Sequence, residues 1–364
     1  MKLLFFVHAI VGGGAERVAS ILMNAYSSKG YDVVLATDAS VAPAFTLSSS
    51  IKILDLKCGV SKTERNIFDK AKRYYKVLCN ARTIAKEINP DIAISFNTSL
   101  NHDIILALLG TKIPLICCEH TNILYNHGFK TMFMRKMLYP FADAVTVLTK
   151  HDYKIWRRKK NVVYMPNPII LQKPLLNVDR QKKVLAAGRL EIWRTKGFDT
   201  LIKCWGKVCK DFPDWELHIA GKGNEKSVKF MEHLIAENHA DHVKLLGFCD
   251  NMHEVMSSSE VFCLTSRREG LPMVLLEAMN AGCCCIAYDC VTGPSDIIEN
   301  GVNGFLVENQ NEEEFICCLK KVLSSKDTRE FLSLHTANSI NKFSIDRVCI
   351  RWNILFSRLS RKKK

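Results

Sequence analysis

The chain has 364 residues, enough for two domains that each bury a core, and its 48% hydrophobic content is that of a globular protein. No stretch approaches the roughly 20 apolar residues of a membrane-spanning helix, and residues 2–7 are too short an apolar run for a signal peptide. The net charge of +14 indicates an anionic partner: a nucleotide, a nucleic acid or a membrane surface. The sequence has fifteen cysteines but no signal peptide and no Cys-x-x-Cys pair. We therefore expect reduced thiols that act as small buried apolar residues, and no metal cluster.

The first elements form a β-α-β unit with a glycine-rich turn. Residues 1–7 predict a buried strand, a helix follows to about residue 30, and residues 31–36 predict the next strand. Gly13 and Gly14 lie in the turn, where backbone can approach a ligand or simply turn tightly. The spacing is not Gly-x-Gly-x-x-Gly, because Arg17 occupies the last position, and this argues against NAD.

Two later stretches combine cations with aromatic or apolar residues. Residues 63–88 predict a long basic helix with interleaved tyrosines, and residues 129–139 combine Phe and Met with Lys and Arg. An ordinary crossover helix with a solvated face explains the first stretch as well as a membrane-contacting surface does. The second stretch favours the membrane interpretation.

A histidine follows one of the next strands. Residues 91–95 and 115–118 predict strands, and the second delivers Glu119 and His120 to its carboxyl end, where ligands bind in such sheets. A structural histidine and a ligand-contacting one are equally compatible with this placement. Another strand is expected within residues 142–149.

A second domain opens with a strand that ends before Gly188. Arg189 follows this strand and Lys196 precedes a helix start, so a guanidinium and an ammonium can clamp a diphosphate. Two ordinary surface cations are the alternative. Strands are also expected within residues 215–223 and 243–248.

The chain is organised around a strand, loop and helix between residues 261 and 282. Gly270 gives the loop conformational freedom, and Pro272 suits the first turn of the helix. The free amides at the helix start, around Gly270, Leu271 and Met273, favour an anion. Glu269 and Glu277 flank this site and can accept hydrogen bonds from sugar hydroxyls. Two exposed surface carboxylates are the simpler alternative.

These motifs resemble those of family 4 retaining glycosyltransferases. Glu269 and Glu277, with Gly-Leu-Pro between them, resemble the E-x7-E motif, and Gly-Arg-Leu with Lys-Gly resembles the diphosphate-binding pair. Gly-Gly-Ala-Glu-Arg resembles the N-terminal loop near acceptor and donor phosphate. The resemblance covers nearly the whole chain with its motifs in family order.

The resemblance implies an α/β fold of the GT-B type, with two Rossmann-like domains facing a central cleft. We expect an acceptor domain at 1–175, a nucleotide-sugar domain at 176–346, and a helix at 347–364 that crosses back to the first domain.

The resemblance also implies the roles of single residues. Arg189 and Lys196 would stabilise the leaving diphosphate, Glu269 would orient the sugar and Glu277 the ribose. His120 would position the sugar or acceptor. The remaining nucleotide-sugar-binding candidates are Gly13, Gly14, Phe248 through its backbone, Gly270, Leu271 and Met273.

The expected reaction is transfer, with retention, of a hexose or N-acetylhexosamine from a nucleotide-diphosphate sugar, most like UDP-sugar users, to a saccharide hydroxyl. The basic surface indicates a lipid-linked acceptor in surface polysaccharide synthesis, an anionic membrane surface as partner, and a peripheral position on the cytoplasmic face of the membrane. No Asp-x-Asp occurs, so the sequence predicts no metal cofactor. No nucleic acid is expected. A UDP-sugar 2-epimerase of the same fold and a basic nucleic-acid-binding protein remain as alternatives.

Overall fold

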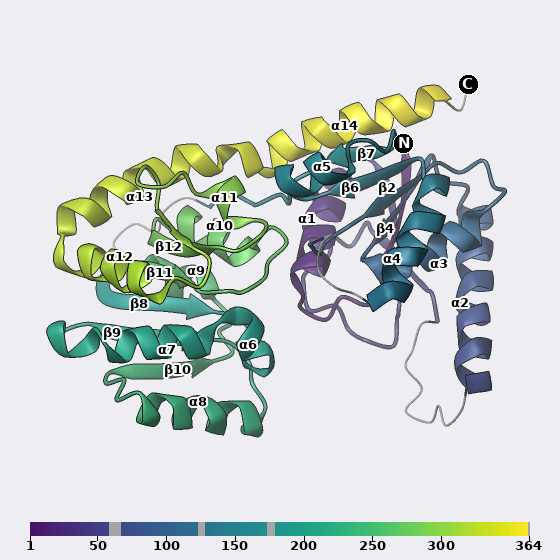
Figure 1. The fold of residues 1–364 in the computed structure, drawn as a ribbon. Helices are drawn as coiled ribbons and strands as arrows, with labels where there is room; N and C mark the ends of the chain where they lie inside the picture. The colour runs from purple at the N-terminus through teal and green to yellow at the C-terminus, as the bar shows by residue number, and fades with distance from the viewer. Residues whose placement is uncertain (58–66, 123–127, 173–178, 363–364) are drawn as a thin grey trace. The chain divides into compact units, whose positions relative to one another are not determined.

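The computed structural model describes residues 1–57, 67–122, 128–172 and 179–362. The chain divides into two compact units, residues 1–170 with 345–364, and residues 171–344. Each unit is built on one parallel sheet with helices on its faces (Figure 1). Among the described residues, no helix combines the length and the apolar character needed to cross a membrane.

The sheet of the first unit has the strand order β3-β2-β1-β4-β5-β6-β7. All its neighbouring strands pair in parallel. The strands are β1 (Lys2–Phe6), β2 (Asp32–Thr37), β3 (Lys52–Asp55), β4 (Ile92–Phe96), β5 (Leu115–Cys118), β6 (Ala144–Val147) and β7 (Val162–Tyr164). The helices of this unit are α1 (Gly14–Ser28), α2 (Ile67–Ile88), α3 (Thr98–Leu108), α4 (Gly128–Leu138), α5 (Lys150–Trp156) and α14 (Ile345–Lys362).

Alternation along the buried strands divides the core of this unit between the two sheet faces. Leu4 and Phe6 of β1 join the apolar cluster formed with α2 and α3, so Leu3 and Phe5 point to the other face. Figure 1 shows α1 on the side of the sheet opposite α2 and α3. The hydroxyl of Tyr26 in α1 donates to Asn353 of α14 at 3.1 Å, which ties the last helix to this unit.

The sheet of the second unit has the order β10-β9-β8-β11-β12-β13, again with parallel neighbours. Its strands are β8 (Gln181–Ala187), β9 (Glu216–Ala220), β10 (Val243–Gly247), β11 (Ser259–Leu264), β12 (Cys284–Asp289) and β13 (Phe305–Glu308). Its helices are α6 (Trp193–Lys196), α7 (Phe198–Gly206), α8 (Glu225–Glu237), α9 (Met252–Ser257), α10 (Met273–Asn280), α11 (Pro294–Ile297), α12 (Glu312–Ser324) and α13 (Lys326–Ile340).

The cysteines behave mostly as small apolar residues. Cys283, Cys284 and Cys285 are all fully buried, because the sheet is covered on both faces. Cys79 and Cys317 are exposed, so burial does not extend to every cysteine. Within the described ranges, the cysteines that the structure places are free thiols.

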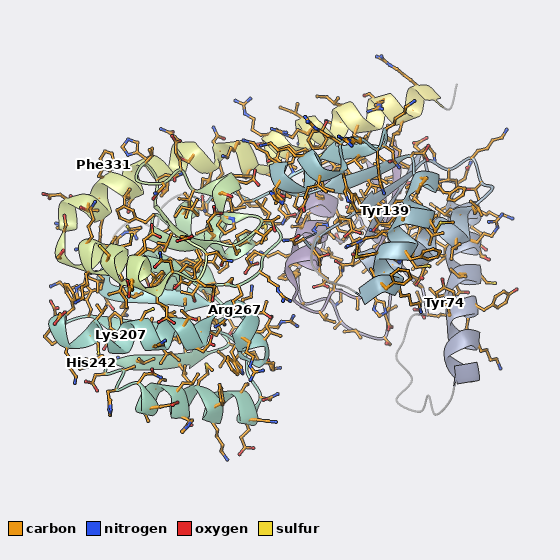
Figure 2. All side chains as sticks on the ribbon, viewed as in Figure 1. Tyr74, Tyr139, Lys207, His242, Arg267 and Phe331 are labelled. Carbon is orange, nitrogen blue, oxygen red and sulfur yellow. The ribbon has the colours of Figure 1, made fainter. Side chains whose placement is uncertain are left out.

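The expected helix at 63–88 begins at Ile67 in the described part of the chain, and residues 63–66 lie outside it. Arg82 of this helix donates to the carbonyl oxygens of Ala107 and Leu109 at 2.7 and 2.9 Å. Arg82 therefore fixes the end of α3 and is not part of a free basic face. Tyr74, which Figure 2 labels, is partly exposed on the same helix, and Tyr75 is more exposed.

Candidate active site

The second unit brings its candidate residues to the point where the strand order reverses. Strand β8 pairs with β9 on one side and with β11 on the other, so the chain leaves β8 and β11 in opposite directions across the sheet. Ligands of open parallel sheets bind outside the carboxyl ends of two such strands. Arg189 follows the first strand and Glu269 lies in the loop that follows the second.

Lys196 and Glu269 meet at this edge. The Lys196 ammonium Nζ donates to Glu269 Oε1 at 2.7 Å, and the two side chains are 19% and 11% exposed. The aliphatic stem of Lys196 lies across Gly188, where a Cβ would come within 3.1 Å of Lys196 Cγ. Glycine at position 188 thus leaves room for the lysine to reach the carboxylate.

Arg189 directly follows Gly188, against which the Lys196 stem lies, and is exposed. Its backbone immediately precedes a short 3-10 helix at Leu190–Ile192. Within the described ranges, the structure gives its guanidinium no hydrogen bond or ion pair, so the planar five-donor group is available to an anion.

The loop and helix after β11 carry the remaining candidates of this region. Helix α10 begins at Met273, and Pro272 is the residue that precedes its first turn instead of belonging to it. Leu271 and Met273 are buried, whereas Glu277 is half-buried in the second turn. Amides at a helix start carry partial positive charge, so an anion is favoured beside this turn.

A neighbouring turn packs closely on the loop that carries Glu269. The Thr292 hydroxyl donates to the carbonyl oxygen of Glu269 at 2.5 Å. Gly293 has a φ of +102°, and a Cβ there would lie only 2.3 Å from the carbonyl oxygen of Gly270. These contacts fix the backbone of Glu269 and Gly270.

Phe248 lies at the carboxyl end of β10, directly after Gly247. Gly247 has a φ of +68°, and its carbonyl oxygen accepts from the Gly221 amide at 2.7 Å. The Phe248 side chain is exposed, so packing does not explain why its backbone turns here.

The first unit holds Gly13, Gly14 and His120. Gly13 precedes α1 and Gly14 is its first residue, at the end of the turn that follows β1. The Glu16 carboxylate occupies the space beside Gly13: a Cβ on Gly13 would lie only 2.0 Å from Glu16 Oε2. Because β1 and β4 flank the reversal of strand order in this sheet, this turn also lies at a switch point.

His120 follows β5 and stacks on Phe96, with ring centroids 5.0 Å apart and planes 17° apart. Burial lowers the pKa of His120 to about 4, so the ring is neutral at pH 7. Both ring nitrogens are buried, and within the described ranges neither has a hydrogen-bond partner. The ring lines a cavity of about 10 Å³ together with Cys118, Asn167 and Trp352. A neutral imidazole with unpartnered nitrogens can offer one donor and one acceptor to a ligand.

Glu119 is the centre of a buried polar network that the sequence did not reveal. Arg135 donates to both Glu119 carboxylate oxygens, at 3.3 and 2.8 Å, and Thr98 donates to Oε2 at 2.8 Å. The Tyr139 hydroxyl, labelled in Figure 2, donates to Oε1. Burial raises the pKa of Glu119, whereas Arg135 opposes that shift.

This network corrects part of the membrane interpretation of residues 129–139. Arg135 is buried against Glu119 and was wrongly expected on an exposed surface. Tyr139, just after α4, is buried in the same network. The apolar residues on the other side of α4 are exposed as expected: Phe129, Met132, Phe133 and Met137. The surface of α4 is therefore apolar and flanked by Lys130 and Lys136, which are also exposed.

Further residues shape the site without having been predicted. Gly188 gives space to Lys196, and Arg267 and Asp199 join the segments that carry Lys196 and Glu269. The position of Gly188 directly before Arg189 could have indicated its role from the sequence. The ion pair between Arg267 and Asp199 joins residues 68 positions apart, so only the folded structure reveals it. Across the described ranges, no group of three or more His, Cys, Asp or Glu side chains is arranged to hold a metal ion.

The glycosyl transferases group 1 model matches residues 170–336, and the glycosyltransferase family 4 model matches residues 12–173. The amylovoran biosynthesis glycosyltransferase AmsD of Erwinia amylovora is 30% identical, over 97% of this chain and 98% of its own. A Campylobacter jejuni α-1,4-N-acetyl-D-galactosaminyltransferase, named for a GalNAc-containing undecaprenol diphosphate, is 28% identical over 97% of each chain. Anabaena Alr3699/HepE, solved with UDP and glucose, has a TM-score of 0.77 and 16% identity over 98% of this chain and 100% of its own.

Proposed function

The chain belongs to the group 1 and family 4 glycosyltransferases with the GT-B fold, and on this premise we propose that it is a retaining enzyme acting in surface polysaccharide synthesis. It transfers a hexose or N-acetylhexosamine from a UDP-sugar to a hydroxyl group of a lipid-linked saccharide. The 1–170 unit binds the acceptor and the 171–344 unit binds the donor.

The observation that carries the proposal is the Lys196–Glu269 pair beside Arg189 at the switch point of the second sheet. A diphosphate leaving group needs positive charge as its bond to the sugar breaks. Two cations and the start of α10 supply it, and preorganised charge of this kind is a large term in catalysis. Glu269 accepts from a donor-sugar hydroxyl, and Glu277 accepts from the ribose.

The proposed reaction breaks the bond between the anomeric carbon and the β-phosphate oxygen of the donor. The acceptor oxygen bonds to the same carbon on the face from which the diphosphate leaves, and its proton passes to the departing phosphate oxygen. Configuration is retained without a covalent intermediate. His120, neutral through burial, positions the sugar or the acceptor through a hydrogen bond.

UDP as the nucleotide is supported by the structural neighbour solved with UDP and glucose. A lipid-linked saccharide as acceptor is supported by the relative named for an undecaprenol diphosphate substrate. The proposal further includes metal independence, because Arg189 and Lys196 neutralise the diphosphate in place of a cation.

Peripheral contact with the cytoplasmic face of the membrane is also part of the proposal. Phe129 is 85% exposed and Phe133 50%, and both lie on α4 with Lys130 and Lys136 nearby. Apolar side chains that enter a lipid interface beside cations suit an anionic membrane. A lipid-linked acceptor would be met there.

The first test is a thermal-shift screen with UDP, GDP, ADP, their sugars and NAD, with and without EDTA. A ligand that binds only the folded protein raises the unfolding temperature by mass action. We expect a UDP shift that survives EDTA and disappears in Lys196→Ala. A shift with GDP alone would indicate a GDP-sugar, instead of a UDP-sugar, as the donor. Folded protein that responds to no nucleotide would contradict the proposal and turn attention to RNA.

The second test follows sugar transfer from UDP-sugars to undecaprenol-diphosphate saccharides. NMR of the product reports the anomeric configuration, and inversion would contradict the retaining mechanism. Interconversion of free UDP-sugars without any acceptor would instead identify a 2-epimerase. Activity that is lost in EDTA and restored by Mg²⁺ or Mn²⁺ would contradict metal independence.

A further inference from the structure

In the second unit, Arg267 connects the α6–α7 turn, where Lys196 is the last residue of α6, to the loop that carries Glu269. It lies two residues before Glu269, and its guanidinium donates to both carboxylate oxygens of Asp199, at 2.7 and 2.9 Å. Figure 2 labels Arg267, which extends from the loop towards α6. The guanidinium also donates to the Arg194 carbonyl oxygen at 2.6 Å and to the Thr200 hydroxyl at 3.0 Å, on the two sides of Lys196 in the chain. The backbone amide of Arg267 donates separately to the Thr195 carbonyl oxygen at 2.9 Å.

A second set of contacts holds the same two segments at backbone distance. The Thr265 hydroxyl donates to the carbonyl oxygens of Gly197 and Lys196, at 2.9 and 3.2 Å. Gly197 has a φ of +67°, and a Cβ there would lie 1.9 Å from the Thr265 carbonyl oxygen. The turn that carries Lys196 therefore rests directly on the loop that leads to Glu269.

The Arg267–Asp199 pair is poorly placed to serve stability alone. The two side chains are 35% and 26% exposed, and ion pairs with this access to water contribute little to the free energy of unfolding. Bidentate geometry, in contrast, fixes the orientation of both groups. Arg267 contacts Asp199 and residues that flank Lys196. The Lys196 ammonium itself donates to Glu269.

We propose that Arg267 is a positioning residue for the donor chemistry. By holding residues 194–200 against the loop before Glu269, it fixes the distance between the Lys196 ammonium and the Glu269 carboxylate. It also keeps the turn in place when the ammonium moves from the carboxylate to a diphosphate. The first step, fixing the distance between Lys196 and Glu269, concerns the ligand-free protein alone. The second step, holding the turn while the ammonium binds a diphosphate, rests on the proposed function.

Reductive methylation of the ligand-free full chain, with formaldehyde and cyanoborohydride, tests the first step. Peptide mass spectrometry gives the rate at Lys196 in wild type, Arg267→Gln, Asp199→Asn and a control, Lys203→Gln. Lys203 lies on the same helix as Asp199 but pairs with Glu312, away from this loop. We expect Lys196 to react about three times faster or more in the first two variants only, because its bond to Glu269 loosens.

An unchanged Lys196 rate in folded Arg267→Gln, or in Asp199→Asn if the arginine variant does not fold, would overturn the inference. Circular dichroism and unfolding midpoints establish that the variants are folded.

Calorimetric titration with UDP tests the second step in a double-mutant cycle of Lys196→Ala and Arg267→Gln. If Arg267 acts through Lys196, its substitution weakens UDP binding about tenfold in the wild-type background and hardly at all in Lys196→Ala. Losses that simply add would overturn the role through Lys196. A wild-type protein that does not bind UDP would contradict the proposed donor, while the methylation rates would still decide the positioning role.

Discussion

Lys196 and Glu269 form a hydrogen-bonded ion pair of 2.7 Å where the diphosphate and the sugar of a donor are proposed to bind. In the ligand-free protein the two charges neutralise each other, and each keeps the other ordered. Donor binding must exchange this contact for one between the ammonium and phosphate. The two residues therefore have opposite electrostatic effects on a bare nucleotide diphosphate.

This relationship predicts different outcomes for Lys196→Ala and Glu269→Gln. The first removes positive charge at the leaving group and leaves a partly buried carboxylate, so UDP binding weakens and kcat/KM falls by about 10²–10³-fold. The second removes the competing negative charge, so UDP binds as tightly as before or more tightly, while sugar transfer falls by a similar factor. Calorimetry with UDP and steady-state kinetics with the UDP-sugar separate the two effects.

Lys203→Gln is the matched control, because it removes one lysine of an exposed ion pair in the same unit. It should change neither UDP affinity nor kcat/KM. Weaker UDP binding in Glu269→Gln, at full stability, would contradict the charge argument and indicate that Glu269 holds the nucleotide itself.

The family fold was predictable from sequence because its motifs are local. A strand, a glycine and a helix start occur within a few residues of Arg189 and Glu269, and each strand end carries its candidate to one edge. The contact between Lys196 and Glu269 was not predicted, since both were assigned to the ligand. It depends on the pairing of β8 with β11, which brings residues 73 positions apart together.

The surface of α4 also shows what local sequence can and cannot predict. Local composition predicted the exposure of Phe129 and Phe133 correctly, but it also assigned Arg135 to that surface. Arg135 turns inward because Glu119, at the end of β5, offers a buried carboxylate 16 residues earlier in the chain. Charge in a sequence window does not show which cations have a buried partner.

We predict that Arg135→Met destabilises the protein strongly. Removing the arginine leaves the fully buried Glu119 without its charge partner, which costs about 3–5 kcal/mol in the free energy of unfolding. Glu119→Gln combined with Arg135→Met should lose less than Arg135→Met alone, because no isolated charge remains. Urea unfolding measures the loss of stability in both variants.

Lys182→Ala, which breaks an exposed pair with Asp214, should leave the free energy of unfolding almost unchanged in the same assay, because water screens this pair. If the double variant at 119 and 135 were less stable than Arg135→Met, the unpaired carboxylate would not be the cause of the loss.

We predict that Phe129→Ser with Phe133→Ser weakens binding to anionic vesicles while leaving transfer to a water-soluble acceptor intact. Each exposed ring contributes to lipid binding in proportion to the apolar area it buries, at most about 1.5–3 kcal/mol for a fully buried side chain. A loss of about tenfold in vesicle affinity is therefore expected for the pair, measured by sedimentation with vesicles that contain phosphatidylglycerol.

Phe331→Ser is the comparison for that experiment, because Phe331 is similarly exposed but lies on α13 of the second unit. It should leave vesicle binding unchanged. Equal losses from the α4 and α13 substitutions would contradict a specific α4 surface and indicate general hydrophobic adsorption.

Finally, His120 should make the stability of the protein pH-dependent on the acid side. Its folded-state pKa is lowered to about 4 by burial, while an unfolded histidine titrates near pH 6.5. Between these values the unfolded chain binds more protons, so the free energy of unfolding falls as pH is lowered from about 6.5 to about 4, by at most about 1.4 kcal/mol per pH unit. Below that window this residue adds no further loss.

His120→Asn should remove that slope, as measured by urea unfolding at several pH values between 4.5 and 6.5, and should also lower sugar transfer. His102→Asn is the matched variant, because burial, with help from Arg135, lowers the pKa of His102 to about 4 as well. The His102 ring is tilted by 48° against Tyr139, and within the described ranges its Nε2 has no hydrogen-bond partner. His102 lies in α3 and not at the strand end that carries the candidate site. It should therefore lose the same slope and keep activity. A His120→Asn protein that retained the full acid slope would show that folding does not lower the pKa of His120, and would contradict the burial of a neutral ring at this position.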